Sequence, residues 1–122
     1  MLKKIVSFGY KRAEPPHNVR IAVVDVRQLF RNPYGDRTLR HLTGKDPEVQ
    51  KEVLRTPNFA AKYQHIKEFV SAPGMDEAWI GCHGGRHRSV YLAERLGAEL
   101  GVPVEHRDLE TTPIDKRPSE GA

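Results

Sequence analysis

The feature that most constrains the fold is a glycine-rich turn placed between an apolar run and an amphipathic segment. Residues 78–82 form the apolar run, and Gly84 and Gly85 follow it. Residues 89–100 then repeat apolar side chains at helical spacing, and Gly101 is the residue type that commonly ends a helix. A short apolar run before a turn is typical of a strand buried on both faces of a parallel sheet. The segment therefore predicts one strand–loop–helix unit of an α/β protein.

Three further runs predict the other strands of that sheet. Residues 5–8 and 20–26 are apolar and β-branched, and residues 102–106 form a shorter run. Pro103 lacks a backbone N–H, so the last run is expected at a sheet edge or at the start of a strand.

Two helix starts are predicted between these strands. Asp46 followed by Pro47 marks the first, and Thr56 followed by Pro57 repeats the signal. Apolar residues then recur on one helical face at Phe59, Tyr63, Ile66 and Val70. The alternation predicts an α/β fold: a small, mostly parallel sheet of four to five strands, flanked by helices in a single layered domain.

The length of the chain bounds its organisation. Its 122 residues suit one domain. We expect residues 1–110 to form that domain and residues 111–122, which are polar and contain two prolines, to form a flexible tail. Residues 12–19 and 30–45 are expected to be loops, and the second is long enough to suggest a functional role.

Composition excludes several classes of protein. No run of about 18 apolar residues is present, so no membrane association is expected. The start of the chain has too short an apolar stretch for a signal peptide, and Cys82 is the only cysteine. Both observations lead us to expect a cytoplasmic protein. The net charge of +4 permits an anionic partner without requiring one.

The segment from residue 81 to residue 89, called the glycine loop below, carries the clearest chemical signal. Its glycines allow backbone N–H groups to converge, the following helix adds its positive dipole end, and its arginines are forked donors suited to phosphate. We predict an anion site, against the alternative of a plain turn with solvated arginines. The candidate anion-binding residues here are Cys82, His83, Gly84, Gly85, Arg86, His87, Arg88 and Ser89, with Ser89 either capping the helix or offering its hydroxyl.

One motif in this loop matches the cysteine phosphatases. Their C-x-x-G-x-x-R-S/T signature is met by Cys82, Gly85, Arg88 and Ser89. Such enzymes attack phosphorus with a thiolate, so Cys82 would be the nucleophile, Arg88 the phosphate clamp and Ser89 the support for the leaving thiolate. No Trp-Pro-Asp general-acid loop is present, and nothing selects Asp25 or Asp108 for that role.

Several motifs in order resemble a second family, the C-terminal domain of the RNase adapter RapZ. These motifs are S-F-G-Y-K at residues 7–11, D-V-R at 25–27 with N-P-Y at 32–34, L-T-G-K-D at 42–46, the glycine loop, and H-R-D-L at 106–109. They span nearly the whole expected domain. The resemblance implies a non-catalytic sensor and adapter, which binds glucosamine-6-phosphate or a similar metabolite, small RNA, and a ribonuclease or other protein.

The resemblance also implies further residues around the anion pocket. On matching positions these are Lys11, Asp25 and Arg27, while His106 and Arg107 are expected at the same pocket or at RNA. The alternatives are a local ion pair for Asp25 and Arg27, a solvated charge for Lys11, and a small buried side chain for Cys82.

Some features depart from the family pattern. His83 replaces a threonine, which predicts pH-dependent anion binding, and the spacer between Arg27 and Asn32 is one residue longer than expected. No G-x-x-x-x-G-K-S/T motif occurs, so we expect a stand-alone domain without nucleotide or other cofactor. His83 and His87 with Cys82 have a spacing that can hold zinc, but they lie on a glycine turn without a carboxylate, so no metal is expected. The sequence is compatible both with a monomer and with a homo-oligomer.

Overall fold

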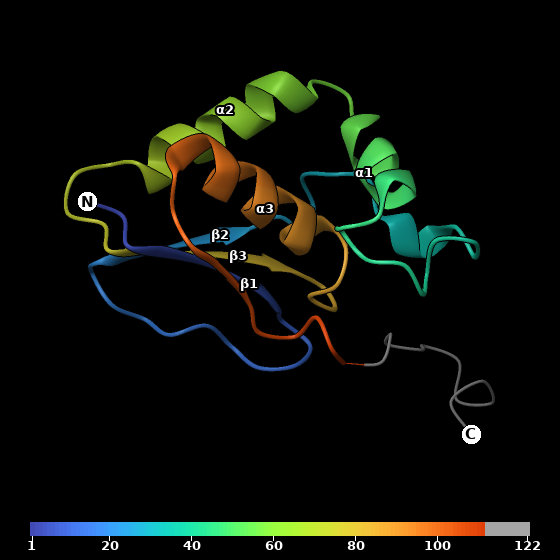
Figure 1. Cartoon of the computed structure of the whole chain (residues 1–122), viewed down its shortest axis with the longest axis horizontal. Helices are drawn as coiled ribbons and strands as arrows, with labels where there is room; N and C mark the ends of the chain where they lie inside the picture. The colour runs from blue at the N-terminus through green and yellow to red at the C-terminus, as the bar shows by residue number, and fades with distance from the viewer. Residues whose placement is uncertain (112–122) are drawn as a thin grey trace.

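A computed structural model of the chain describes residues 1–111 and shows an α/β fold (Figure 1). The strands are β1 (Lys4–Gly9), β2 (Ile21–Asp25), β3 (Glu77–Cys82) and β4 (Val104–His106). They form a four-stranded sheet in the order β2-β3-β1-β4, with every pairing parallel. The helices are the 3-10 helix η1 (Pro33–Gly35) and the α-helices α1 (Pro47–Leu54), α2 (Phe59–Val70) and α3 (Arg88–Leu100). The predicted fold class is confirmed.

The three α-helices lie on one side of the sheet, and the segment that joins β1 to β2 runs along the other side (Figure 1). Strand alternation explains the core beneath the helices, because residues at every second position of a strand share a face. Ile5, Val24 and Ile80 are buried there with Leu92 and Leu96 of α3.

An aromatic cluster occupies the opposite face of the sheet. The rings of Phe8 and Tyr10 are 4.8 Å apart, and the ring of Trp79 lies 5.7 Å from Phe8. The guanidinium of Arg107 lies 5.2 Å from the centre of the Phe8 ring. Phe8 itself is completely buried, so this face also carries a small core.

Local sequence explains the ends of two helices. Asp46 and Pro47 begin α1 as predicted, although the Asp46 carboxylate accepts its hydrogen bond from the backbone N–H of Thr43 and not from α1. Gly101 ends α3 in the left-handed conformation with φ 68°, which a residue without Cβ adopts at little cost.

One predicted helix start is wrong, and one of the two roles considered for Ser89 is not found. Thr56 does not begin α2, because its hydroxyl accepts a 2.8 Å hydrogen bond from the N–H of Arg31, and the helix begins three residues later at Phe59. Ser89 does not cap α3 either: His87 takes that position, and the Ser89 side chain turns into the protein interior.

The topology brings three strand ends together at one edge of the sheet. Gly9 of β1 is in register with Cys82 of β3, and Asp25 of β2 is in register with Gly81. Because all strands are parallel, their carboxyl ends meet at this edge, where α/β proteins commonly bind ligands. No helix within residues 1–111 is long and apolar enough to cross a membrane.

Candidate anion-binding site

A polar cavity of about 330 Å³ opens at the carboxyl edge of the sheet, at the ends of β2 and β3. Its lining combines two arginines with one histidine, one carboxylate and two carboxamides. These residues are Asp25, Arg27, Gln28, Asn32, His83 and Arg88. The cavity therefore offers cationic donors for an oxyanion beside groups that can bind hydroxyl or amino groups.

Arg88 is the buried cation of this cavity, with only 4 % of its surface exposed. Its Nη1 atom donates to the carbonyl oxygen of Arg27 at 2.6 Å and lies 3.5 Å from that of Phe30. Its Nε atom is buried and has no hydrogen-bond partner within the described part of the chain. Burial lowers the pKa of Arg88, while the nearby Cys82 and Asp25 favour its charged form. A buried guanidinium with unused donor capacity is well suited to an anionic ligand.

Arg27 and Asp25 form the exposed rim of the cavity. The Arg27 guanidinium pairs with the Asp25 carboxylate at 2.7 Å and lies 3.9 Å from the centre of the Tyr10 ring. Hydrogen bonding to Arg27 lowers the pKa of Asp25, so the carboxylate stays ionised at neutral pH. The local ion pair considered from the sequence is thus present, and both of its partners also line the cavity.

Gln28 and Asn32 complete the lining, and sequence reasoning did not select either as a site residue. Asn32 carries a detectable signal, since it belongs to the N-P-Y motif and its Oδ1 atom accepts from the N–H of Tyr34 to cap η1. Gln28 lies in the spacer that is one residue longer than expected, and no local pattern marks it.

Several predicted site residues of the glycine loop point inward instead of lining the cavity. Cys82 is 2 % exposed; its Sγ atom lies 3.1 Å from the Ser89 hydroxyl and accepts from the N–H of Gly85 at 3.3 Å. Gly84 and Gly85 pack against Gly9, where a Cβ atom would clash with backbone atoms at 2.4–2.6 Å. These contacts pack the end of β1 directly against the glycine loop.

Arg86 and His87 connect the glycine loop to neighbouring loops. Arg86 donates to the carbonyl oxygens of Thr111 at 2.9 Å and His41 at 3.2 Å. Burial lowers the pKa of His87, the adjacent arginines add to that effect, and the carbonyl groups of Leu42 and Arg40 oppose it. Neither side chain lines the cavity.

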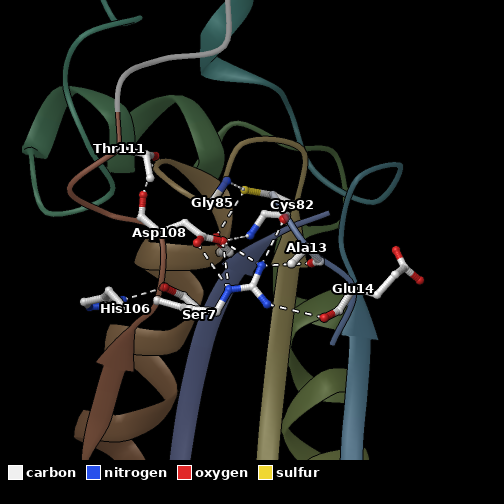
Figure 2. A network of polar contacts seen from close by, with 11 residues as sticks. Ser7, Ala13, Glu14, Cys82, Gly85, His106, Asp108 and Thr111 are labelled. Carbon is white, nitrogen blue, oxygen red and sulfur yellow. Dashed lines mark hydrogen bonds and ion pairs between the residues drawn. The ribbon is translucent and has the colours of Figure 1, made fainter. Parts of the chain in front are cut away.

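The remaining predicted residues lie outside the cavity. The side chain of Lys11 is exposed on the turn after β1. The ring of His106 bridges the Ser7 hydroxyl and the Glu94 carboxylate, each at 2.6 Å. Arg107 belongs to a polar network around Asp108, to which it donates at 2.8 Å (Figure 2).

That network holds the end of β1 to the chain after β4. Asp108 accepts from the N–H of Gly9 at 2.8 Å, and Arg107 donates to the carbonyl oxygens of Gly9, Ala13 and Glu14 (Figure 2). The Thr111 hydroxyl in turn donates to the carbonyl oxygen of Asp108 at 2.6 Å. Thr111 is thereby fixed, and the rest of the expected tail, residues 112–122, lies outside the described residues.

The fold and the cavity define a class of protein: an α/β domain with a cationic pocket at the carboxyl edge of a parallel sheet. The chain belongs to the RapZ C-terminal domain family, whose model matches residues 1–110. The predicted resemblance is confirmed over the entire length of the motifs on which it was based.

Curated relatives agree with this membership. A nucleotide-binding protein of Heliobacterium modesticaldum is 41% identical over 120 residues, which cover 87% of this chain and 39% of the relative. A nucleotide-binding protein of Deinococcus radiodurans is 39% identical over 121 residues, covering 87% of this chain and 42% of the relative. One of Limosilactobacillus reuteri is 38% identical, with 88% of this chain and 41% of the relative covered. The chain thus spans about two-fifths of the length of these relatives.

Proposed function

We propose that this chain is a non-catalytic adapter or regulatory domain that senses a phosphorylated metabolite in the cavity at the carboxyl edge of its sheet. The observation that carries the proposal is the buried guanidinium of Arg88, which lines the cavity and keeps its Nε donor unpaired among the described residues. Family membership supports the adapter or regulatory role.

The lining of the cavity supports a sugar phosphate with an amino group, such as glucosamine-6-phosphate. Arg88 and Arg27 supply the charges that a phosphoryl dianion needs. Asp25 offers a carboxylate to an ammonium or a hydroxyl group, and Gln28 and Asn32 offer amides to sugar hydroxyls. A cavity of about 330 Å³ is at the lower end of the range for small-molecule sites.

Calorimetric titration tests this proposal, with glucosamine-6-phosphate, glucosamine and inorganic phosphate as separate probes. We expect saturable binding that is tightest for the sugar phosphate. Arg88→Lys keeps the charge but loses the planar fork, and Arg27→Gln removes a rim charge, so each variant should weaken binding by about tenfold. Arg55→Gln is the matched control, because Arg55 is exposed and pairs with Glu52. No saturable binding, or equal binding by all four proteins, would overturn the proposal.

RNA is the macromolecular partner that we propose beside the metabolite. The net charge of +4 and the exposed side chains of Lys11, Arg37 and Lys45 support it. Fluorescence anisotropy with a labelled RNA hairpin measures the binding constant at several salt concentrations. We expect the logarithm of the binding constant to fall linearly with the logarithm of the salt concentration, and Arg37→Glu should weaken the binding of RNA. Binding that is independent of salt, or no binding at low salt, would exclude RNA.

A phosphatase is the second candidate function, and one observation favours it. The Cys82 Sγ atom accepts from the N–H of Gly85 at 3.3 Å and lies 3.1 Å from the Ser89 hydroxyl, the residue that such an enzyme places beside its nucleophile. However, Cys82 is 2 % exposed and does not line the cavity that Arg88 faces. We therefore expect no release of phosphate from p-nitrophenyl phosphate, and Cys82→Ser should bind glucosamine-6-phosphate as the native chain does. Phosphate release that Cys82→Ser abolishes would make Cys82 a nucleophile.

A further inference from the structure

Arg88 lines the cavity, and its guanidinium also contacts a long surface segment. Within the described residues, all hydrogen bonds of this guanidinium come from its Nη1 atom, which donates to the carbonyl oxygens of Arg27 and Phe30. The opposite edge, formed by Nε and Nη2, makes no hydrogen bond to any residue from 1 to 111. That edge has the geometry that binds an oxyanion through two parallel hydrogen bonds. One planar group can therefore hold a ligand on one edge and the main chain on the other.

The main chain that Nη1 holds begins a segment from residue 26 to residue 41, here called the 26–41 segment. Arg27, Gln28 and Asn32 from its first part line the cavity. Its second part, residues 33–41, contributes no lining residue. A ligand in the cavity would thus touch only the first part of the segment.

Hydrogen bonds continue from the first part of the segment to the second. The Asn32 side chain accepts from the N–H of Tyr34, and the Tyr34 carbonyl oxygen accepts from Nε of Arg40 at 2.9 Å. The Arg40 guanidinium also lies 4.7 Å from the centre of the Tyr34 ring. Residues 32–40 are therefore connected to the cavity wall through Asn32.

The far end of the segment returns to the glycine loop. Arg86 donates to the carbonyl oxygen of His41, and its own carbonyl oxygen accepts from the N–H of Gly44 at 2.8 Å. Arg86 and Arg88 thus hold the two ends of the same segment. Most of the side chains between them are exposed, so the segment between its two ends is held mainly by these contacts and by its own hydrogen bonds.

We propose that ligand binding in the cavity is coupled to the order of the whole 26–41 segment. The inference rests on the proposed function, since it needs an oxyanion in the cavity. An anion on the Nε–Nη2 edge fixes the guanidinium of Arg88, which strengthens the hold of Nη1 on Arg27 and Phe30. Because coupling between two sites is reciprocal, the converse must also hold. A change that loosens the segment far from the cavity should weaken the affinity of the cavity for its ligand.

Hydrogen-exchange mass spectrometry of the full chain tests the first half of the coupling, with glucosamine-6-phosphate and inorganic phosphate as probes. Exchange should slow by about fivefold or more at residues 33–41, which do not line the cavity, as well as at the lining residues. Calorimetry on the same sample records occupancy. Saturable binding with protection confined to residues 25–32 and 83–88 would overturn the coupling alone. No binding of either probe would overturn both the coupling and the proposed function.

A substitution outside the cavity tests the converse. Arg40→Leu removes the hydrogen bond to Tyr34 and the ring contact, and it should weaken glucosamine-6-phosphate binding by about fivefold. Arg37→Leu is the matched control: it lies three residues away on the same segment and its side chain is exposed. Equal affinity of the Arg40→Leu and Arg37→Leu proteins for the ligand would overturn the proposal.

Discussion

Gly85 packs its main chain directly against Gly9, so that no side chain separates the glycine loop from the end of β1. A Cβ atom on Gly85 would lie 2.6 Å from the backbone nitrogen of Gly9 and 2.9 Å from the Cβ atom of Asp108. The same Gly9 nitrogen donates to the Asp108 carboxylate. The loop, the first strand and the chain after the last strand therefore meet at one point.

This contact predicts that Gly85→Ala is strongly destabilising. Gly85 has φ +79°, which strains any residue with a Cβ atom, and the added methyl group also collides with backbone. We expect the free energy of unfolding in urea to fall by about 2–4 kcal/mol. Two controls separate the causes: Gly101→Ala has the strained φ in open space and should cost about 1 kcal/mol, and Gly35→Ala has neither problem. Similar losses at Gly85 and Gly101 would show that the close packing contributes nothing.

Asp108 should be a stabilising residue and not a catalytic one. The residue is 7 % exposed, and its carboxylate accepts hydrogen bonds from the N–H of Gly9 and from the Arg107 guanidinium. Asp108→Ala leaves a buried N–H without its acceptor, so we expect a loss of about 2–4 kcal/mol in unfolding free energy. Asp108→Asn keeps an acceptor and should lose less. Glu68→Ala, on the exposed face of α2, is the control; a loss at Asp108 as small as at Glu68 would contradict this view.

The fold was largely predictable because it depends on patterns within short segments. Apolar runs located the four strands, and Pro47 and Gly101 marked helix ends correctly. The start of α2 was not predictable, because the Thr56 hydroxyl binds the N–H of Arg31, a residue 25 positions away, instead of capping its own helix. A contact of that kind depends on tertiary structure and leaves no local trace.

The candidate site was predictable only in part, for a similar reason. The sequence predicts that the residues of the glycine loop share one anion site, but adjacent residues at the start of a helix point in different directions. His83 and Arg88 consequently line the cavity, while Arg86 holds the carbonyl oxygen of His41. Gln28 lines the cavity because of the conformation of the long loop that contains it. Short-range sequence patterns do not specify the conformation of such a loop.

The buried His87 predicts a loss of stability in mild acid. Burial lowers the pKa of His87 below its ordinary value of 6.5, so the folded protein binds this proton less readily than the unfolded chain. The stability due to the neutral ring is complete above about pH 6.5 and declines as the pH falls below that value. Carboxylates with a lowered pKa, such as Asp25 and Asp76, lose their contribution only at lower pH, because their ordinary value is 3.8.

Urea unfolding between about pH 7.5 and pH 5 measures this effect. We expect the unfolding free energy of the native chain to fall across this range, and His87→Gln to flatten the slope, because glutamine does not titrate. His65→Gln is the control, since His65 is exposed on α2. Equal slopes in the native chain and the His87→Gln protein would assign the acid sensitivity to another group.

His83 predicts a pH dependence of ligand affinity that is separate from stability. It lines the cavity with Arg27, Arg88 and the ionised Asp25, so protonation of its ring adds a positive charge facing the ligand. Sulfate is the appropriate probe, because it remains a dianion throughout the range in which histidine titrates, whereas a phosphate monoester does not. We expect sulfate affinity to rise about threefold or more from about pH 8 to about pH 5.5.

His83→Gln should remove that rise while leaving binding at the higher pH unchanged, and circular dichroism should verify that both proteins are folded at the lower pH. Equal sulfate affinity of the native chain at the two pH values would refute the role of His83, and an equal rise in the His83→Gln protein would transfer it to a different titrating group.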